Sequence, residues 1–204
     1  MAIRINHNEI PSTVFEAKRW WREEVKNHFG ELTDDYMVAS SGKMMESLIR
    51  MKEYRNAKTV MLYVSVGKEV ITNTLMTTAS RQGKIICLPL CLDTVNHIQE
   101  ARLWNKEHRL VTGAYNIPTP DPDSPVVKPE EIDMVILPCV SCDVDCNRLG
   151  HGAGYYDRYL EQLRDDCVTV AFCYDKLLAD KLPTEPHDRK VDIVITEENI
   201  YRSK

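Results

Sequence analysis

The chain lacks the features of several broad protein classes. No apolar run approaches the roughly 20 residues that a membrane-spanning helix needs. The first ten residues hold neither a long apolar stretch nor a signal-cleavage site. A net charge of −5 leaves no basic surplus of the kind that general nucleic-acid or membrane binders carry. We therefore expect a cytoplasmic protein, working as a monomer, that binds neither membranes nor nucleic acid.

The cysteines do not form a disulfide pattern. There are seven, an odd number, and several lie inside apolar runs. The spacing Cys139-x-x-Cys142-x-x-x-Cys146 resembles part of a zinc motif, but it lacks a second matching pair, and the nearest histidine is His151. The sequence favours reduced, partly buried thiols over a zinc site.

Internal repeats and low-complexity linkers are absent, and at 204 residues the chain is expected to form a single domain, residues 1–204. Its hydrophobic periodicity predicts a helical N-terminal segment over about 13–54, followed by alternating strands and helices, which is typical of an α/β fold. The predicted helices cover about 13–30, 34–54 and 70–81, with another after residue 155. The predicted strands cover 59–64, 84–88, 97–104, 134–137, 168–172 and 191–196, and 111–129 is predicted as a surface loop.

Glycine is scarce, yet three of the eight glycines alternate within residues 150–154, between the apolar run 134–137 and a helix-like segment. Such a turn lets backbone N–H groups approach an anion, and a helix N-terminus adds partial positive charge. Arg148 and Arg158 add cations at its two ends, and Asp157 adds a hard oxygen suited to Mg²⁺. The pattern predicts a nucleoside-triphosphate site, although it is neither a Walker A loop nor a dinucleotide fingerprint. The alternative is a tight strand-to-helix turn without a ligand.

Two charged features extend this hypothesis, namely the pair Lys18 and Arg22 and the single residue Glu69. Lys18 and Arg22 lie one helical turn apart, so both could reach one polyphosphate, although a solvated basic stripe fits the spacing as well. Glu69 follows the first predicted strand, where ligands bind in open α/β sheets, and its carboxylate suits a planar ring bearing N–H groups. The alternative for Glu69 is a first-turn residue that complements the helix dipole.

A third cluster lies in residues 186–192. Asp188 would pair with Asp157 as a ligand of Mg²⁺ if the fold brought the two together, and the alternative is a turn before a strand. His187 has no serine or cysteine partner in the sequence that would indicate a hydrolase triad.

Taken in chain order, these motifs extend over nearly the whole sequence. They are Lys18-x-x-x-Arg22, Tyr63-Val64-Ser65, Glu69-Val70-x-Thr72, Gly83-Lys84 with Leu88-Pro89, Asn116-Ile117-Pro118-x-Pro120, residues 147–158 from Asn147 to Arg158, His187-Asp188-x-x-Val191-Asp192 and Ile195-Thr196-Glu197. This series resembles the 5-formyltetrahydrofolate cyclo-ligase family, whose members are also called methenyltetrahydrofolate synthetases.

The resemblance implies a three-layer α/β sandwich around a mainly parallel sheet. It also implies an enzyme that uses ATP and Mg²⁺ to close 5-formyltetrahydrofolate, with or without a polyglutamate tail, to 5,10-methenyltetrahydrofolate. In such a reaction ATP phosphorylates the formyl oxygen, N10 of the same folate attacks, and ADP and phosphate are released. The protein would mainly position the reactants and neutralise charge.

By position, the resemblance assigns catalytic roles to Arg148 and Tyr155 and metal ligation to Asp157 and Asp188. Nucleotide contacts fall to Lys18, Arg22, Arg148, Leu149, Gly150, His151, Gly152, Ala153, Gly154, Tyr155 and Tyr156. Folate contacts fall to Val64, Glu69, His151, Gly152, Ala153, Gly154 and Tyr155.

The chain departs from the family pattern at three positions. His151 replaces a usual tyrosine or arginine, Ala153 a glycine or lysine, and Thr119 a glutamate or glutamine. A histidine beside phosphates leads to the hypothesis that activity depends on pH near neutrality. The alternatives to the enzyme are a binding protein without turnover and a sugar-phosphate enzyme on a similar scaffold.

Overall fold

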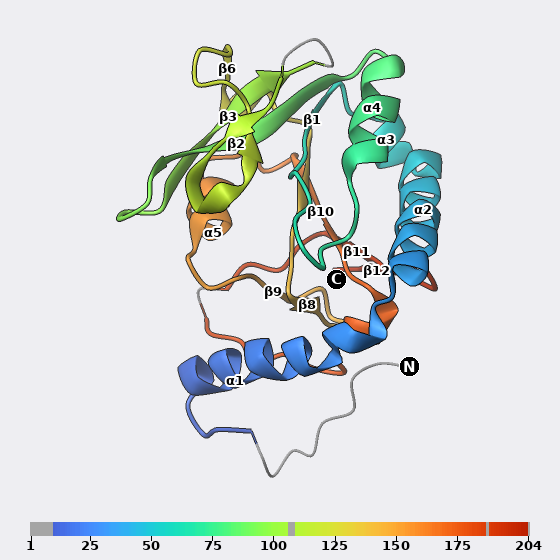
Figure 1. The fold of residues 1–204 in the computed structure, drawn as a ribbon, viewed down its shortest axis with the longest axis vertical. Coiled ribbons are helices and arrows are strands. Elements are labelled where there is room, and N and C mark those ends of the chain that lie inside the picture. Colours follow the sequence, from blue (N-terminus) through green and yellow to red (C-terminus); the bar gives the residue numbers. More distant parts are fainter. Residues whose placement is uncertain (1–9, 106–108, 187, 204) are drawn as a thin grey trace.

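The computed structural model describes residues 10–105, 109–186 and 188–203. Within them, eight strands form one sheet in the order β12-β11-β10-β7-β1-β2-β3-β6 (Figure 1). These strands are β1 (Thr59–Met61), β2 (Ile85–Asp93), β3 (Ile98–Trp104), β6 (Val126–Val127), β7 (Met134–Leu137), β10 (Val168–Phe172), β11 (Ile193–Ile195) and β12 (Ile200–Arg202). Two small sheets pair β4 (Val111–Thr112) with β5 (Pro118–Thr119) and β8 (Ser141–Cys142) with β9 (Arg148–Leu149).

The centre of the large sheet is parallel and its edges are antiparallel. The strands β2, β1, β7, β10 and β11 run parallel to one another. At one edge β3 is antiparallel to β2 and β6 is antiparallel to β3, and at the other edge β12 is antiparallel to β11. Residues 134–137 of β7 are fully buried, as expected for a strand covered on both faces. The predicted α/β fold with a mainly parallel sheet is confirmed.

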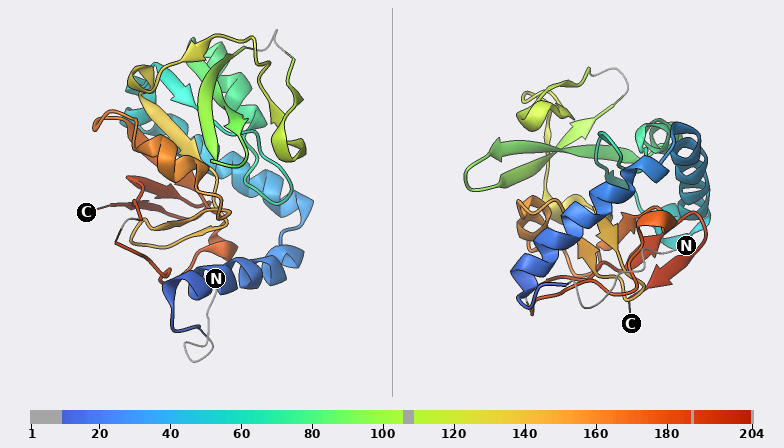
Figure 2. Two further views of the ribbon diagram at one scale, coloured as in Figure 1. Left: turned by 90° about the vertical axis from the view of Figure 1, so that its left-hand side faces the viewer. Right: turned by 60° about the horizontal axis from the view of Figure 1, so that its bottom comes forward.

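Helices cover both faces of the sheet. The α-helices are α1 (Val14–Asn27), α2 (Asp34–Arg50), α3 (Lys52–Asn56), α4 (Asn73–Arg81) and α5 (Tyr155–Leu160), and the 3-10 helices are η2 (His28–Glu31), η3 (Ala114–Asn116), η4 (Pro129–Glu131) and η5 (Asp175–Leu177). Figures 1 and 2 show α2, α3 and α4 on one side and α5 on the other, which gives the three layers. The helix α1 lies across the end of the sheet where the parallel strands finish (Figure 1).

The N-terminal helix follows the predicted pattern. Thr13 caps it by accepting a hydrogen bond from the backbone N–H of Glu16 at 3.3 Å. Ala17, Trp21 and Val25 are its buried residues. Lys18 and Arg22 lie beside this apolar stripe and are half-buried.

The predicted helix 34–54 is interrupted. The helix α2 ends at Arg50, and Met51 is extended with ψ 143° before α3 begins. The break lets Met51 and Tyr54 both be buried, and the hydroxyl of Tyr54 donates to Gln82 at 2.8 Å. Packing against the core has outweighed continuous helical hydrogen bonding here.

The predicted end of a strand at Pro89 is wrong, because β2 continues to Asp93. The N–H of Ile85 and the carbonyl of Cys87 both face the β1 side, where they bond to Lys58 and Leu62. Pro89, two residues further along, has its missing N–H on that same side, but β1 has already ended. Proline is tolerated there because no ladder bond is lost.

Two further local predictions are corrected, and two elements were not predicted. The helix predicted from residue 70 begins at Asn73, because the Thr72 hydroxyl donates to the carbonyl of Tyr63 at 2.6 Å and holds Thr72 against the end of β1. The loop over 111–129 contains β4, β5 and β6. The antiparallel edge strand β12 and the β8–β9 hairpin have no counterpart in the prediction.

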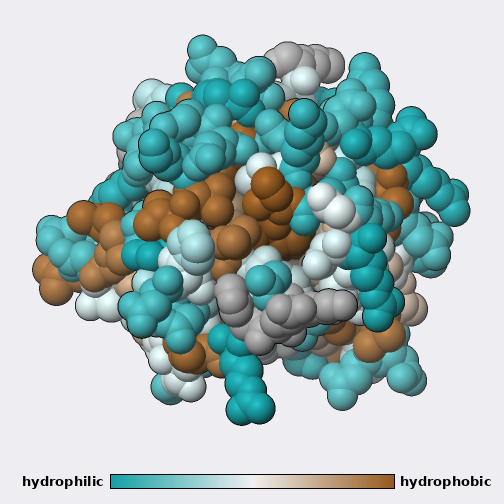
Figure 3. Space-filling view, turned by 90° about the horizontal axis from the view of Figure 1, so that it is seen from above, coloured by the Kyte–Doolittle hydropathy of each residue, from teal (hydrophilic) through white to brown (hydrophobic). Residues whose placement is uncertain are grey.

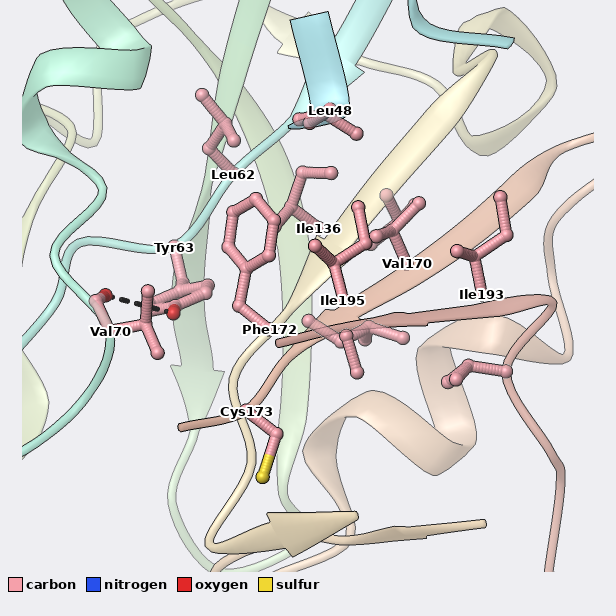
Figure 4. Close-up of a cluster of buried hydrophobic side chains, with 14 of the residues drawn as sticks. Leu48, Leu62, Tyr63, Val70, Ile136, Val170, Phe172, Cys173, Ile193 and Ile195 are labelled. Carbon is pink, nitrogen blue, oxygen red and sulfur yellow. Dashed lines mark hydrogen bonds between the residues drawn. The ribbon is translucent and has the colours of Figure 1, made fainter. Parts of the chain in front are cut away.

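The hydrophobic core joins the elements in one cluster. Figure 4 shows Leu48 of α2 over Ile136, Val170 and Phe172 of the sheet. It also shows the hydroxyl of Tyr63, which donates to the Val70 carbonyl at 3.0 Å. Outside the core, hydrophobic side chains gather across the face in Figure 3, partly over the β2–β3 hairpin that projects to the same side in Figure 1. None of the helices described is long and apolar enough to cross a membrane.

Candidate active site

A cavity of about 460 Å³ opens beside the ends of β1 and β7. Its walls come from the loop after β1, from β2 and β3, from the segment 114–119 and from the glycine loop 150–154. The lining includes these predicted site residues: Val64, Glu69, Arg148, Gly150, His151, Gly152, Ala153, Gly154, Tyr155, Tyr156 and Asp157. The structure therefore brings all seven predicted folate contacts to one cavity.

The glycines allow the loop to pack closely against arginines. Gly152 has φ +101° and Gly154 has φ +75°, both in the left-handed region that favours glycine. A Cβ on Gly152 would lie 3.2 Å from Cζ of Arg22, and one on Gly150 would lie 2.8 Å from Nη1 of Arg148. Only glycine at these positions lets the two guanidinium groups approach the loop.

The helix that follows the loop is shorter than the sequence suggests. The α5 helix has six residues, and Arg158 turns back so that its Nη1 donates to the carbonyl of Gly154 at 3.0 Å. So short a helix contributes little macrodipole. An anion at the glycine loop would therefore be attracted mainly by the loop N–H groups and by the neighbouring cations.

On the side away from the cavity, the loop faces α1. Nε of Arg22 donates to the Gly150 carbonyl at 2.8 Å. Burial lowers the pKa of Arg22, and Asp157 and Asp188 oppose this shift. Both carboxylates thus lie within electrostatic range of one guanidinium.

Lys18, one helical turn before Arg22, is held by two carboxylates. Its Nζ lies 2.8 Å from Oε2 of Glu185 and 2.6 Å from Oδ2 of Asp188. Burial lowers the pKa of Lys18, but hydrogen bonds to Asp188 and Glu185 outweigh it, so the pKa is raised. The basic helix face is therefore not a freely solvated stripe.

Arg148 is buried, with 5% of its side chain exposed. Nη2 lies 2.7 Å from Oδ1 of Asp157, and Nη1 donates to the Pro138 carbonyl at 3.1 Å. Leu149 next to it lies in the core, and its carbonyl accepts from Val140 in the β8–β9 hairpin. Of the groups of Leu149, the side chain packs in the core and the carbonyl is bonded to Val140, so neither is available for the predicted nucleotide contact.

The two predicted metal ligands bind different cations in this structure. Asp157 pairs with Arg148, and Asp188 pairs with Lys18. Their carboxylate oxygens are a donor set that suits Mg²⁺, with phosphate and water oxygens completing the coordination. His187, named with Asp188 in the sequence motif, lies outside the described residues.

Glu69 lines the cavity from the loop after β1, and the Glu69 side chain stabilises this loop. Oε2 accepts from the N–H of Val66 at 2.9 Å, and Oε1 lies 3.0 Å from Nε2 of His151. Because α4 begins only at Asn73, Glu69 is not a first-turn residue, and that alternative is wrong. The structure thus brings together two of the predicted folate contacts.

Tyr155 spans from α5 to the β2–β3 hairpin. Its hydroxyl lies 3.1 Å from Sγ of Cys91 and 3.4 Å from the hydroxyl of Tyr115. Its ring packs edge-on against His97, with centroids 5.1 Å apart. Burial raises the pKa of Tyr155, so the hydroxyl stays protonated at neutral pH.

Sequence reasoning missed Gln99, which also lines the cavity. Gln99 is 9% exposed, and among the described residues its Nε2 has no hydrogen-bond partner. A buried unpaired amide donor beside a cavity is a candidate ligand contact. It stands in an alternating strand, β3, where no local pattern distinguishes it.

Comparisons with known proteins identify the family. The 5-formyltetrahydrofolate cyclo-ligase family model matches residues 14–197. The mouse 5-formyltetrahydrofolate cyclo-ligase is 30% identical in an alignment of 200 positions that covers 92% of this chain and 97% of the mouse protein. The NMR structure of Aquifex aeolicus 5,10-methenyltetrahydrofolate synthetase has a TM-score of 0.80 at 28% identity, covering 91% of this chain and 92% of that one.

A second solved structure supports the fold alone. The 5,10-methenyltetrahydrofolate synthetase from Mycoplasma pneumoniae has a TM-score of 0.70 at 21% identity and covers 88% of this chain and 98% of that one. The family match extends from the first residue of α1 to beyond β11, so it includes every segment that forms the cavity and the glycine loop. This chain belongs to the 5-formyltetrahydrofolate cyclo-ligase family.

Proposed function

We propose that this enzyme closes 5-formyltetrahydrofolate to 5,10-methenyltetrahydrofolate with consumption of Mg-ATP and release of ADP and phosphate. The supporting observation is the position of the glycine loop. One side of residues 150–154 lines the 460 Å³ cavity, and the other contacts Arg22 on α1. A folate in the cavity and phosphates against α1 would meet at this loop.

The charged pairs around the loop suit a metal–nucleotide complex. Lys18 with Asp188 and Arg148 with Asp157 are two cation–carboxylate pairs. Mg-ATP brings a cation for the carboxylates and an anion for the lysine and arginine. Binding can thus exchange the partners of these four groups without leaving a charge unpaired.

The cavity suits a folate ring system. Its volume lies in the range of about 300–1,000 Å³ that is usual for small-molecule sites. Glu69, with 12% of its side chain exposed, offers a carboxylate to ring N–H groups. Gln99 offers amide N–H donors, and the Tyr155 ring offers a flat surface for stacking.

When bound, Mg-ATP supplies the phosphoryl group that activates the formyl oxygen, which leaves as phosphate once N10 of the same folate attacks the formyl carbon. Arg148 is anchored by the Pro138 carbonyl and would neutralise charge on the transferred group. Tyr155, held protonated, would donate a hydrogen bond near the reacting atoms. The proposal needs no covalent nucleophile from the protein, so positioning is the main contribution of these residues.

The test is the near-ultraviolet absorbance of 5,10-methenyltetrahydrofolate after the protein is mixed with 5-formyltetrahydrofolate and Mg-ATP. We expect a rise that requires ATP and Mg²⁺ and is lost in Asp157→Ala. Glu161→Ala is the matched control, because Glu161 is an exposed carboxylate at the end of the same helix and does not line the cavity.

No rise from the folded wild-type protein would contradict the proposal and favour a binding protein without turnover. A rise without ATP would favour chemistry of another class. That the protein is a cytoplasmic monomer stays a prediction, which sedimentation of the purified chain and localisation of a tagged copy would test.

A further inference from the structure

Three cysteines converge at the ends of two neighbouring strands. Cys139 lies two residues after β7, Cys173 directly follows β10, and Cys142 belongs to β8. Their three Sγ atoms all lie within 4.8 Å of one another. Because β7 and β10 are parallel neighbours, residues just past their ends meet at one edge of the sheet.

The third sulfur is not the one that the sequence spacing suggested. Cys146 lies in the turn between β8 and β9 with φ +65°, and its carbonyl accepts from the N–H of Val191. The group instead contains Cys173, which is 34 positions from Cys139 in the chain. Two cysteines of the partial sequence motif, Cys139 and Cys142, thus form a group of three with Cys173 through the tertiary structure.

The three cysteines are buried to different degrees. Cys142 is fully buried and Cys173 is 2% exposed, whereas Cys139 is partly exposed. The sulfur of Cys173 points away from the hydrophobic side chains in Figure 4. All three cysteines are free thiols.

We propose that Cys139, Cys142 and Cys173 form a binding site for a thiophilic d¹⁰ metal ion of the Zn²⁺ or Cu⁺ class. An all-sulfur donor set selects such ions over Mg²⁺ or Ca²⁺. With a Zn–S bond of about 2.3 Å, ligand sulfurs stand about 3.8 Å apart, so modest side-chain shifts suffice. The Cys139 thiol donates to the Phe172 carbonyl at 3.0 Å, and a bound ion would replace this proton.

The surroundings favour a metal over a disulfide. A disulfide would join two of the sulfurs and leave the third unused, whereas one ion engages all three. Arg148 lies within electrostatic range of Cys139 and would offset the negative charge of three thiolates around one ion. An ion that binds three thiols displaces their protons, so its affinity must fall at low pH.

The test is titration of the reduced, metal-free full chain with Cd²⁺, read from the ultraviolet band of cadmium–thiolate bonds. We expect saturation at one Cd²⁺ per chain, with weaker binding at lower pH. Cys139→Ser and Cys173→Ala should each weaken Cd²⁺ binding by about tenfold or more, since loss of an outer-shell partner alone costs that much. Cys146→Ser is the matched control and should bind as the wild type does.

A second measurement needs no variant. Alkylation of the folded wild-type chain with and without Cd²⁺, followed by peptide mass spectrometry, should show protection of the partly exposed Cys139 and none of Cys91. Displacement of Cd²⁺ by Zn²⁺ or by Cu⁺ then identifies the better-bound ion. Absence of the band, or a band that depends on Cys146 and not on Cys173, would overturn the proposal.

Discussion

Glu69 and His151 stand 82 residues apart in sequence, and Nε2 of His151 lies 3.0 Å from Oε1 of Glu69 at the cavity. The imidazole is 60% exposed, whereas the carboxylate is 12% exposed and its other oxygen is held by the N–H of Val66. A ligand N–H can therefore reach the free side of Glu69 only by sharing it with His151 or displacing it. This makes His151 a competitor for the group that we propose binds the folate.

The first prediction concerns this pair. The imidazole must give up its contact with the carboxylate before a ligand N–H can use it alone. We expect the KM for 5-formyltetrahydrofolate to fall in His151→Phe, which removes this competitor. Glu69→Gln should raise the KM by about 10-fold to 100-fold, for loss of a hydrogen bond to a charged group. Steady-state kinetics with the folate as the varied substrate will measure both, and an unchanged or higher KM in His151→Phe would contradict this account.

The second prediction concerns Gly152. A Cβ here would lie 3.2 Å from Cζ of Arg22, and φ +101° strains any other residue. Gly152→Ala should shift Arg22 and lower kcat/KM for ATP by about tenfold or more, on the scale of one lost charge-assisted contact. Steady-state kinetics with ATP as the varied substrate will measure it.

Gly42→Ala is the matched control for that change. Gly42 lies inside α2, and a Cβ there would meet nothing within 4 Å. Alanine should stabilise the helix by about 0.5–1 kcal/mol and leave the kinetics unchanged. If both variants kept full activity, the close packing of Arg22 on the loop would have no part in ATP use.

The third prediction concerns Gln99, whose Nε2 is buried and has no partner among the described residues. Gln99→Met keeps the volume and removes the donors. The unliganded protein should become as stable or more stable, because an unpaired buried donor is costly. The KM for 5-formyltetrahydrofolate should rise by about fivefold to twentyfold, while the KM for ATP stays constant.

Thr119→Val is the comparison for Gln99. The Thr119 hydroxyl lines the same cavity but already donates to the Pro89 carbonyl at 3.0 Å. Its loss should cost about 1 kcal/mol of stability and leave the folate KM unchanged. Thermal unfolding alongside kinetics separates the two variants, and equal folate KM values in wild type and Gln99→Met would refute a ligand contact at Gln99.

The fourth prediction concerns pH and stability. Burial raises the pKa of Asp133, but the N–H groups of Thr59 and Lys58 and the Arg164 guanidinium outweigh it, so the pKa lies below the ordinary value. A carboxyl with a depressed pKa stabilises the fold above its unfolded pKa and loses this effect as pH falls through its folded pKa. Asp133→Asn should therefore lower the free energy of unfolding by about 1–3 kcal/mol at pH 7.

The difference in free energy of unfolding between the wild type and Asp133→Asn should shrink below about pH 3.9, the ordinary pKa of aspartate. Urea unfolding at pH 7 and pH 3 measures it. Asp145→Asn, at an exposed aspartate, should show little effect at either pH. An equal loss at pH 7 and pH 3 in Asp133→Asn would show that charge is not the cause.

Local patterns in the sequence were enough to predict much of the fold. The strands at 134–137 and 168–172 have the predicted bounds, because an apolar run between turn residues is a property of the run itself. The Thr13 cap and the glycine loop between a strand and a helix depend equally on near neighbours. The family resemblance rested on the order of such motifs, and it was confirmed.

Tertiary structure alone decided which distant groups meet. It placed Lys18 against Asp188, 170 positions away, and exchanged Cys146 for Cys173 in the sulfur cluster. It also extended β2 past Pro89 and placed Gln99 in the wall of the cavity. Periodicity and turn chemistry act over a few residues, so the sequence determined the elements. The partners of each side chain depend on how those elements pack, and that is set by the whole core at once.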